Sequence, residues 1–329
     1  MADRVRWGVL STAGIGTEKV IPGIGRSARG EVVAIASRDA ALARHTADRL
    51  GIPRAHGSYE ALLADPDVDA IYNPLPNHLH AEWTIAALRA GKHVLCEKPV
   101  GLDVAEAERM AAVAAETGRV LMEAFMYRHH PAWITVRELV ASGRIGTLVA
   151  VDSWFSYYLD DPANIRSIAA YGGGALYDVG CYCVNLSRML FGSEPLGVSA
   201  AMIRDPQSGV DLLTSGTLAF ATGVASFTCA TRLEPDQRVH VYGTEGRISI
   251  GIPFNIPPLL PTQVFLTTGR NAPEAWTTET IDIPAADAYA CEVDAFAAAV
   301  LDGAPVPVPM ADAIANMAVI GRLFEAAGA

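Results

Sequence analysis

Short apolar runs and helical stretches alternate through the first part of the chain, and this alternation restricts the fold more than any other feature. Each apolar run is bounded by turn-forming residues, which is typical of a buried strand. Strands are expected at 5–10, 31–37, 68–72, 93–96 and 120–122, with helices at 17–27, 39–50, 78–90 and 103–117. This order predicts right-handed βαβ units and therefore an α/β domain with a doubly wound parallel sheet.

Beyond residue 127 the pattern changes to strands that succeed one another without long helices between them. Alternation of polar and apolar residues, as in Thr217-Leu218-Ala219-Phe220, is typical of an antiparallel sheet with one covered face. Gly243-Thr244-Glu245-Gly246 has the composition of a hairpin turn. Because 329 residues exceed what one core usually supports, we expect two domains, 1–126 and 127–329. The second is expected to be α+β, with a large open, mainly antiparallel sheet.

The composition excludes several classes of protein. The net charge is −11 without any basic stripe, which argues against nucleic-acid binding. No apolar run is long enough to span a membrane, and the N-terminus has no signal-peptide core. The five cysteines are scattered and odd in number, so we expect free thiols and a cytoplasmic location. Cys181-Tyr182-Cys183 has no second pair with ligand spacing, and no metal site is expected.

The loop after the first strand carries small residues where the dinucleotide fingerprint has glycine, namely Ser11, Ala13 and Gly16. A phosphate could approach this backbone and the N-terminus of the following helix. The alternative is an ordinary tight βα turn. The second expected strand ends in Ser37-Arg38, where an NAD site usually has Asp or Glu. A hydroxyl and a guanidinium suit a 2′-phosphate, so a dinucleotide site would favour NADP; the alternative is a solvated arginine.

Two further stretches contain side chains suited to catalysis or ligand binding. The expected strand at 93–96 leads into Glu97-Lys98-Pro99, and ligands bind at such carboxyl ends in open α/β sheets. A Glu–Lys surface pair is the alternative. The glycines at 172–174 precede a predicted helix on which Asp178 and Tyr182, four residues apart, share a face. Tyrosine needs a nearby cation to act as acid or base at neutral pH, and Lys98 is the candidate. The alternative is a core tyrosine and a capping aspartate.

Three motifs together resemble the Gfo/Idh/MocA oxidoreductases, and the resemblance covers nearly the whole chain. They are Glu97-Lys98-Pro99, Asn73-Pro74-Leu75-Pro76-Asn77-His78-Leu79-His80, and Gly172-Gly173-Gly174 followed by Asp178-x-Gly180. The resemblance implies a dinucleotide-binding Rossmann domain at 1–126 and a substrate-binding and dimerisation domain at 127–329. Tyr182 stands where many members have His. This is similar to the branch with xylose dehydrogenase, dihydrodiol dehydrogenase, glucose–fructose oxidoreductase and nucleotide-sugar ketoreductases.

The resemblance also implies roles for individual residues. Lys98 would be the catalytic lysine, Tyr182 the proton donor or acceptor, and Asp178 would bind substrate or orient the acid/base group. The cofactor, NADP with NAD as the alternative, would contact Ser11, Thr12, Ala13, Gly14, Ile15, Ser37, Arg38, Pro74, Leu75, Asn77, His80, Glu97 and Lys98. The substrate would contact Arg128, Tyr157, Asn164, Arg166, Asp178 and Tyr182.

The function expected from these residues is an NADP-dependent dehydrogenase or reductase. It would transfer hydride between a sugar-like carbinol or carbonyl and nicotinamide. Three alternatives remain: a ketoreductase for nucleotide-linked deoxysugars, a nicotinamide-dependent glycosidase, and a non-catalytic dinucleotide sensor. The partner would be a small polyhydroxylated molecule, and the open sheet is expected to join copies of the chain into a homodimer or homotetramer.

Overall fold

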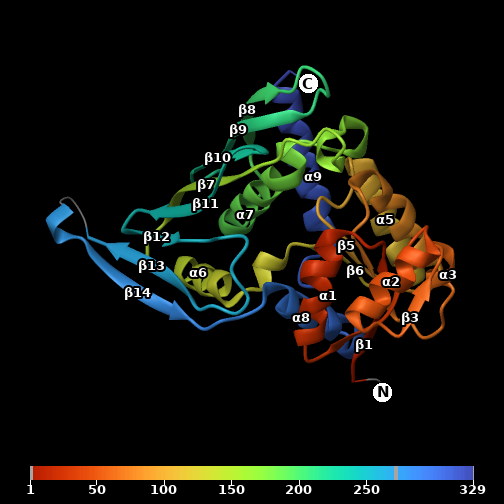
Figure 1. Ribbon diagram of the computed structural model, residues 1–329. Helices are drawn as coiled ribbons and strands as arrows, with labels where there is room; N and C mark the ends of the chain where they lie inside the picture. Colours follow the sequence, from red (N-terminus) through yellow and green to blue (C-terminus); the bar gives the residue numbers. More distant parts are fainter. Residues whose placement is uncertain (1–2, 270–272, 329) are drawn as a thin grey trace. The chain divides into compact units, whose positions relative to one another are not determined.

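The computed structural model describes residues 3–269 and 273–328 and divides into two compact units. The first unit comprises the chain up to residue 129 together with 287–317. The second comprises 130–286 and the C-terminal residues from 318 onward. Figure 1 shows that each unit is built on its own sheet.

The first unit contains alternating strands and helices. Its elements are β1 (Val5–Leu10), η1 (Gly16–Val20), α1 (Ile21–Arg26), β2 (Gly30–Ala36), α2 (Ala40–Leu50), β3 (Arg54–His56), α3 (Tyr59–Leu63), β4 (Ala70–Asn73), η2 (Asn77–Leu79), α4 (His80–Arg89), β5 (His93–Glu97), α5 (Val104–Thr117), β6 (Leu121–Ala124), η3 (Met126–His129), α8 (Ala288–Asp302) and the beginning of α9 (Met310–Ala326).

The described strands of this unit form one parallel sheet in the order β3-β2-β1-β4-β5-β6. Near-continuous apolar strands such as β1 are buried on both faces, as a sheet covered by helices requires. Helix α8 packs beside α1, and its Phe296 ring lies 5.0 Å from the ring of Trp7. The predicted doubly wound parallel sheet is confirmed. The short elements β3 and α3 were not predicted.

The second unit contains α6 (Pro131–Ala141), β7 (Leu148–Tyr158), η4 (Ile165–Ser167), η5 (Ala169–Tyr171), η6 (Leu176–Gly180), α7 (Cys181–Phe191), β8 (Gly197–Arg204), β9 (Asp211–Ala219), β10 (Val224–Ala230), β11 (Arg232–Gly243), β12 (Gly246–Ile250), β13 (Thr262–Thr268), η7 (Pro273–Ala275) and β14 (Thr277–Ile283). The described strands form one sheet in the order β14-β13-β12-β11-β7-β10-β9-β8. Only the β7–β10 pair among them is parallel.

Helices cover one face of this second sheet. Helices α6 and α7 pack against its strands (Figure 1). Leu323 of α9 lies beside Gly216 of β9. Alternation along β10 buries Ala225, Phe227 and Cys229. The predicted open, mainly antiparallel sheet is confirmed, as is the β11–β12 hairpin, whereas β14 was not predicted.

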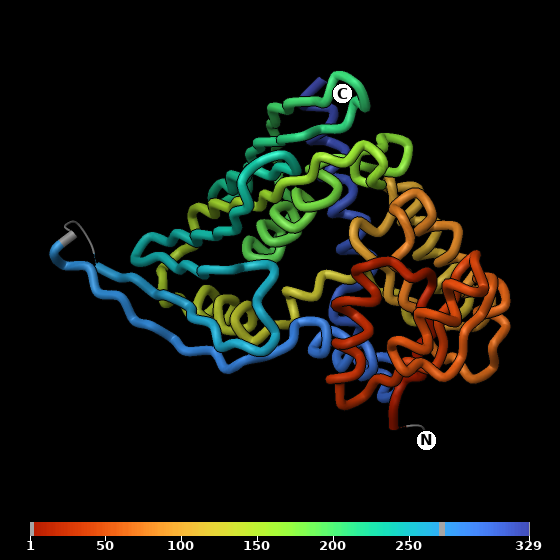
Figure 2. Tube along the Cα trace, in the orientation of Figure 1, coloured from red at the N-terminus to blue at the C-terminus, as the bar shows by residue number. Residues whose placement is uncertain are grey.

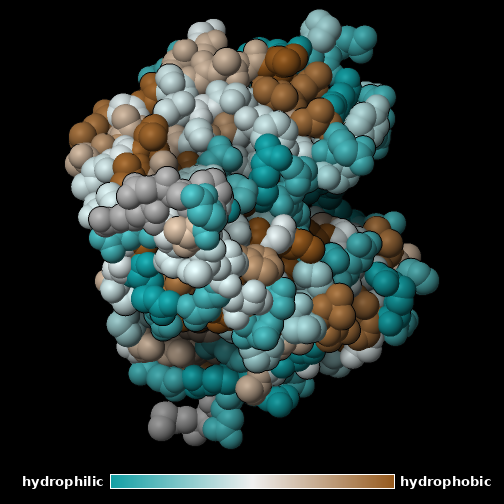
Figure 3. All heavy atoms as spheres, turned by 90° about the vertical axis from the view of Figure 1, so that its left-hand side faces the viewer, coloured by the Kyte–Doolittle hydropathy of each residue, from teal (hydrophilic) through white to brown (hydrophobic). Residues whose placement is uncertain are grey.

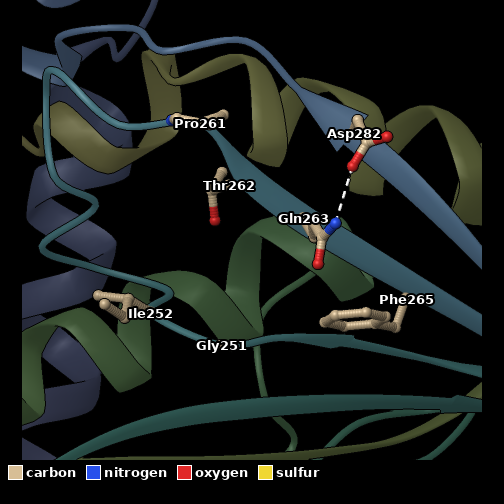
Figure 4. Close-up of a pocket in the computed structure, with 7 residues that line it drawn as sticks. All are labelled: Gly251, Ile252, Pro261, Thr262, Gln263, Phe265 and Asp282. Atoms are coloured by element: carbon tan, nitrogen blue, oxygen red, sulfur yellow. Dashed lines mark hydrogen bonds between the residues drawn. The ribbon is translucent and has the colours of Figure 1, made fainter.

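The surface of the second unit carries a shallow pocket of about 380 Å³. It lies where the end of β12 and the beginning of β13 approach β14, and Gln263 donates a hydrogen bond to Asp282 at its rim (Figure 4). The predicted site residues do not line it. In Figure 3, brown apolar side chains lie in separate groups among polar ones. Among the described helices, none is both long and apolar enough to cross a membrane.

Candidate active site

The loop after β1 adopts the tight turn that its small residues allow. Ser11 has a φ of 70°, the left-handed region that the first glycine of the fingerprint usually occupies. Its hydroxyl oxygen accepts a hydrogen bond from the backbone N of Ala13 at 3.3 Å, which offsets part of the strain. Thr17 donates to the carbonyl of Ala13 from its backbone N at 3.0 Å. Thr12 completes the turn, and Gly14 and Ile15 are already helical and lead into a π-helical turn, η1.

The end of β2 presents a hydroxyl and a cation. Ser37 is buried, and its hydroxyl oxygen accepts a hydrogen bond from the backbone N of Asp39 at 3.1 Å. The Asp39 carboxylate caps α2, as predicted, by accepting from the backbone N of Ala41 and Leu42. Arg38 is exposed and lies near Tyr59, a neighbour that the sequence did not indicate. Burial raises the pKa of Tyr59, so it remains a neutral neighbour of the guanidinium.

Glu97 at the end of β5 holds the backbone of Lys98. The buried Glu97 carboxylate accepts from the hydroxyl of Tyr72 at 2.7 Å and from the backbone N of Lys98 at 3.2 Å. Burial, together with the adjacent Glu97, raises the pKa of Tyr72 well above its usual value, so Tyr72 serves as a donor. The side chain of Lys98 is half-buried. Its backbone is therefore fixed by a carboxylate while its side chain reaches solvent.

His80 links the loop after β4 to the turn after Lys98. Its side chain is fully buried, with Nδ1 2.8 Å from the carbonyl oxygen of Pro99 and Nε2 2.7 Å from that of Leu75. Leu75 lies with Pro74 and Asn77 in the segment predicted to contact the cofactor. Burial lowers the pKa of His80 to about 4.

Arg128 forms an ion pair within the first unit. It lies in η3 and donates from Nη1 to Asp312 Oδ2 at 2.7 Å. The two side chains are only 14% and 20% exposed, so the pair is partly desolvated. Asp312 lies at the beginning of α9, and no local sequence signal connects it with η3.

Asp178 forms hydrogen bonds with other predicted substrate residues of the second unit. Its Oδ2 accepts hydrogen bonds from the hydroxyl of Tyr157, at the end of β7, and from Nε of Arg166 at 2.8 Å. Asn164 accepts from the backbone N of Arg166 at 3.1 Å and so begins the turn that carries this arginine. Figure 2 shows this part of the chain as the yellow-green segment leading into the green α7. The structure thus brings four predicted residues together.

Tyr182 belongs to α7, directly after the π-helical turn η6 that carries Asp178. Its side chain is buried, with ring centroids 5.5 Å from Phe155 and 5.4 Å from Phe254. Burial and the neighbouring carboxylate of Asp178 raise the pKa of Tyr157 far above its usual value. Tyr157 is therefore a donor, and of the two predicted tyrosines Tyr182 is the better candidate for proton transfer.

The two units carry the predicted residues separately. Those for the cofactor, with Lys98 and Arg128, belong to the first unit, and those around Asp178 and Tyr182 belong to the second. Among the residues that the structure describes, no group of three or more His, Cys, Asp or Glu side chains could hold a metal ion.

Comparison with known proteins places both units in one family. Residues 5–125 match the model of an oxidoreductase family with an NAD-binding Rossmann fold, and residues 133–249 match the GFO/IDH/MocA C-terminal domain. The uncharacterized oxidoreductase ORF334 of Rhizobium meliloti is 43% identical over 99% of this chain and 97% of its own. The D-xylose 1-dehydrogenase (NADP(+)) 2 of Haloferax volcanii is 42% identical over 98% of this chain and 97% of its own.

A solved structure supports the same assignment. The 3-ketoreductase of Actinomadura kijaniata, in complex with NADP and TDP-benzene, matches with a TM-score of 0.90 and 32% identity, covering 98% of both chains. The resemblance read from the three sequence motifs is confirmed: this chain is an enzyme of the GFO/IDH/MocA family of oxidoreductases.

Proposed function

We propose that the protein is an NADP-dependent oxidoreductase that transfers hydride between a sugar-like carbinol or carbonyl and nicotinamide. The observation that carries this proposal is the convergence of Tyr157 and Arg166 on one oxygen of Asp178. These bonds fix the carboxylate and leave it 14% exposed, a suitable acceptor for a substrate hydroxyl. Relatives named for D-xylose and for a 3-keto sugar support this substrate class.

The residues of the first unit fit NADP. The loop at Ser11 provides small side chains before a helix N-terminus, where a pyrophosphate binds well. At the end of β2, Arg38 offers an exposed cation beside Ser37, while the nearby carboxylate of Asp39 is engaged in capping α2. This arrangement suits a 2′-phosphate. When bound, the nicotinamide ring would accept or donate the hydride.

The proposed proton transfer uses Lys98 and Tyr182. Tyr182 takes the hydroxyl proton of the carbinol as a tyrosinate during oxidation and returns it as a phenol during reduction. Lys98 stabilises the tyrosinate and holds the same substrate oxygen. Asp178 holds a second hydroxyl. Glu97 fixes the lysine backbone, and the aromatic rings around Tyr182 limit its side-chain freedom.

A panel of free aldoses, polyols and dihydrodiols with NADP⁺ and NAD⁺ tests this function. We expect NADP⁺-dependent turnover of a pentose or hexose, lost in Lys98→Met and Tyr182→Phe although NADPH still binds. Tyr158→Phe is the matched control, because this tyrosine at the end of β7 is 65% exposed. Unchanged turnover in Lys98→Met or Tyr182→Phe would contradict the roles assigned to them.

Cofactor preference provides a separate test. Arg38→Ala should weaken NADP⁺ binding at least about tenfold more than NAD⁺ binding, because it removes the cation facing a 2′-phosphate. Arg49→Ala, an exposed arginine in the last turn of α2, is the matched control. Equal losses for both cofactors would refute the proposed phosphate contact.

One alternative function, a ketoreductase for nucleotide-linked sugars, is favoured by a specific structural observation. The Arg166 side chain remains 40% exposed although its Nε is bonded to Asp178, so it could also meet a phosphate of a nucleotide-linked sugar. The relative solved with TDP-benzene makes this class worth testing. Turnover of a TDP-linked keto sugar, with no turnover of any free sugar in the panel, would favour the ketoreductase.

We also propose that two copies of the chain form a dimer through the open face of the second sheet, and that the enzyme is cytoplasmic. Exposed apolar side chains on the strand face opposite the helices support the interface, among them Ile203, Val224 and Tyr242. All five cysteines are free thiols, which fits a reducing compartment. Sedimentation showing a monomer at micromolar concentration would exclude the dimer.

A further inference from the structure

Asp211 is a buried carboxylate that has no part in the roles assigned above. It is the first residue of β9 and is only 1% exposed. Its Oδ2 accepts hydrogen bonds from the backbone N of Leu176 at 2.8 Å and from the hydroxyl of Thr214 at 2.6 Å. Leu176 begins η6, the turn that carries Asp178. A carboxylate from a distant strand thus anchors the start of this turn.

The other oxygen of Asp211 fills a space beside the glycine run. Gly174 has a φ of 112°, and a Cβ placed there would collide with Oδ1 of Asp211. Gly174 also connects two residues of the candidate site, since its backbone N donates to the carbonyl of Arg166 at 2.9 Å and its carbonyl accepts from the backbone N of Asp178 at 3.1 Å. Asp211 therefore packs against the backbone link between Arg166 and Asp178.

We propose that Asp211 is a positioning residue, which holds the segment 174–178 so that the carboxylate of Asp178 meets Tyr157 and Arg166. This proposal rests on the proposed role of Asp178 in binding a substrate hydroxyl. It assigns Asp211 no contact with substrate or cofactor. The effect passes through the backbone of Leu176 and Gly174, so loss of Asp211 should disturb substrate binding and leave cofactor binding intact.

The surroundings of Asp211 define its charge state. Its carboxylate accepts hydrogen bonds from the Thr214 hydroxyl in β9 and from the backbone N of Leu176 in η6. The Cys229 thiol of β10 and the guanidinium of Arg204, at the end of β8, interact with it electrostatically. Burial raises the pKa of Asp211 to about 6, against the lowering effect of the hydrogen bonds from Thr214 and Leu176. A neutral amide at this position would keep an acceptor for Leu176, so Asp211→Asn separates the hydrogen bond from the charge.

Hydrogen exchange tests the positioning without any substrate. In Asp211→Ala, amides in a peptide covering 174–182 should exchange at least about tenfold faster, because a hydrogen bond to a buried carboxylate is lost. Asp211→Asn should restore exchange to within about threefold of wild type. Thr214→Val is the matched control, since it removes the other bond to the same oxygen and keeps the contact with Leu176. Wild-type exchange in Asp211→Ala would overturn the proposal.

Kinetics tests the consequence for the site. Asp211→Ala should raise KM for the sugar about tenfold or more, with NADPH affinity, measured by fluorescence, within about twofold of wild type. Asp211→Asn should largely restore KM. If Asp211→Ala does not fold, Asp211→Ser replaces it, because its shorter side chain withdraws the acceptor from the backbone N of Leu176. Faster exchange confined to 174–182 together with a raised KM in Asp211→Ser supports the proposal, and wild-type exchange and KM in this variant overturn it. A wild-type enzyme inactive on all sugars would refute the proposed function and leave the exchange result standing.

Discussion

The charge state of His80 can be predicted from two opposing influences. A neutral imidazole has one N–H, yet both ring nitrogens face carbonyl oxygens, at 2.8 and 2.7 Å. Protonation would provide a hydrogen for each carbonyl, but it would place a charge in a fully buried position near Lys98. Burial has the larger effect and lowers the pKa to about 4. We therefore expect His80 to be neutral at pH 7.

This expectation gives the sign and size of a pH effect on stability. The folded pKa of about 4 lies below the unfolded value of 6.5, so the folded state binds fewer protons between these values. Stability due to His80 is present above pH 6.5 and is lost as the pH falls toward 4. The loss reaches about 2 kcal/mol at pH 5 and about 3 kcal/mol below pH 4.

The assay compares urea unfolding of wild type and His80→Gln at pH 7 and pH 5, with an NMR titration of the histidine ring protons. Glutamine can still donate to one carbonyl, and the variant should lose about 2 kcal/mol less stability than wild type on acidification. His93→Gln should behave similarly, because burial also lowers the pKa of His93 to about 4 and its Nδ1 accepts from the backbone N of Val120. The exposed His45 serves as control in His45→Asn.

Parallel losses of stability in wild type and His80→Gln, with a His80 ring that titrates above pH 6.5, would refute this reasoning. The two carbonyl contacts would then have overcome the cost of burying the charge. His80 would then carry a positive charge near Lys98 at pH values below this raised pKa.

Three further substitutions test the geometry. Gly174→Ala should destabilise the second unit by at least about 3 kcal/mol in urea unfolding, because the φ of Gly174 excludes a side chain and the added Cβ would strike a buried carboxylate. Gly192 has a φ of 62° and open space around it, so the control Gly192→Ala should cost only about 1 kcal/mol. Arg128→Met should cost about 3 kcal/mol by removing this cation from the partly buried Asp312, and restoration by the double variant with Asp312→Leu would confirm the coupling. Ser11→Gly should keep NADP affinity and change stability by less than about 1 kcal/mol, because relief of the positive φ offsets the added chain entropy; a large loss of affinity would show that the Ser11 hydroxyl binds the cofactor.

The sequence predicted the fold well where the pattern was local. Apolar runs bounded by turn residues located the long strands, and the cap at Asp39 located the start of α2. Short elements such as β3, with three half-buried residues, carry too little periodicity to be recognised. The chain order also gave no sign that α8 would pack with the first unit, because that depends on contacts such as Phe296 with Trp7.

The partners of the site residues were largely beyond prediction. Asn164, Arg166 and Asp178 lie close in the sequence, and the family resemblance implied all three as substrate residues. Tyr72 is 25 residues from Glu97, Asp211 is 35 from Leu176 and Asp312 is 184 from Arg128. Such pairs are brought together only by the tertiary fold. The sequence therefore indicates which residues carry chemistry more readily than which residues hold them in place.

The two π-helical turns show why helical spacing alone is an incomplete guide to this site. In η1 the next helix contains Pro22, which cannot donate the bond to Glu18 that an α-helix would require, and the wider turn accommodates this loss. In η6 the backbone N of Cys181 bonds to the carbonyl of Leu176, five residues earlier. The prediction that Asp178 and Tyr182 share a face assumed α-helical geometry throughout. Because the π turn closes over five residues instead of four, the angle between Asp178 and Tyr182 departs from the α-helical value that this prediction assumed. That the two side chains share a face stays a prediction.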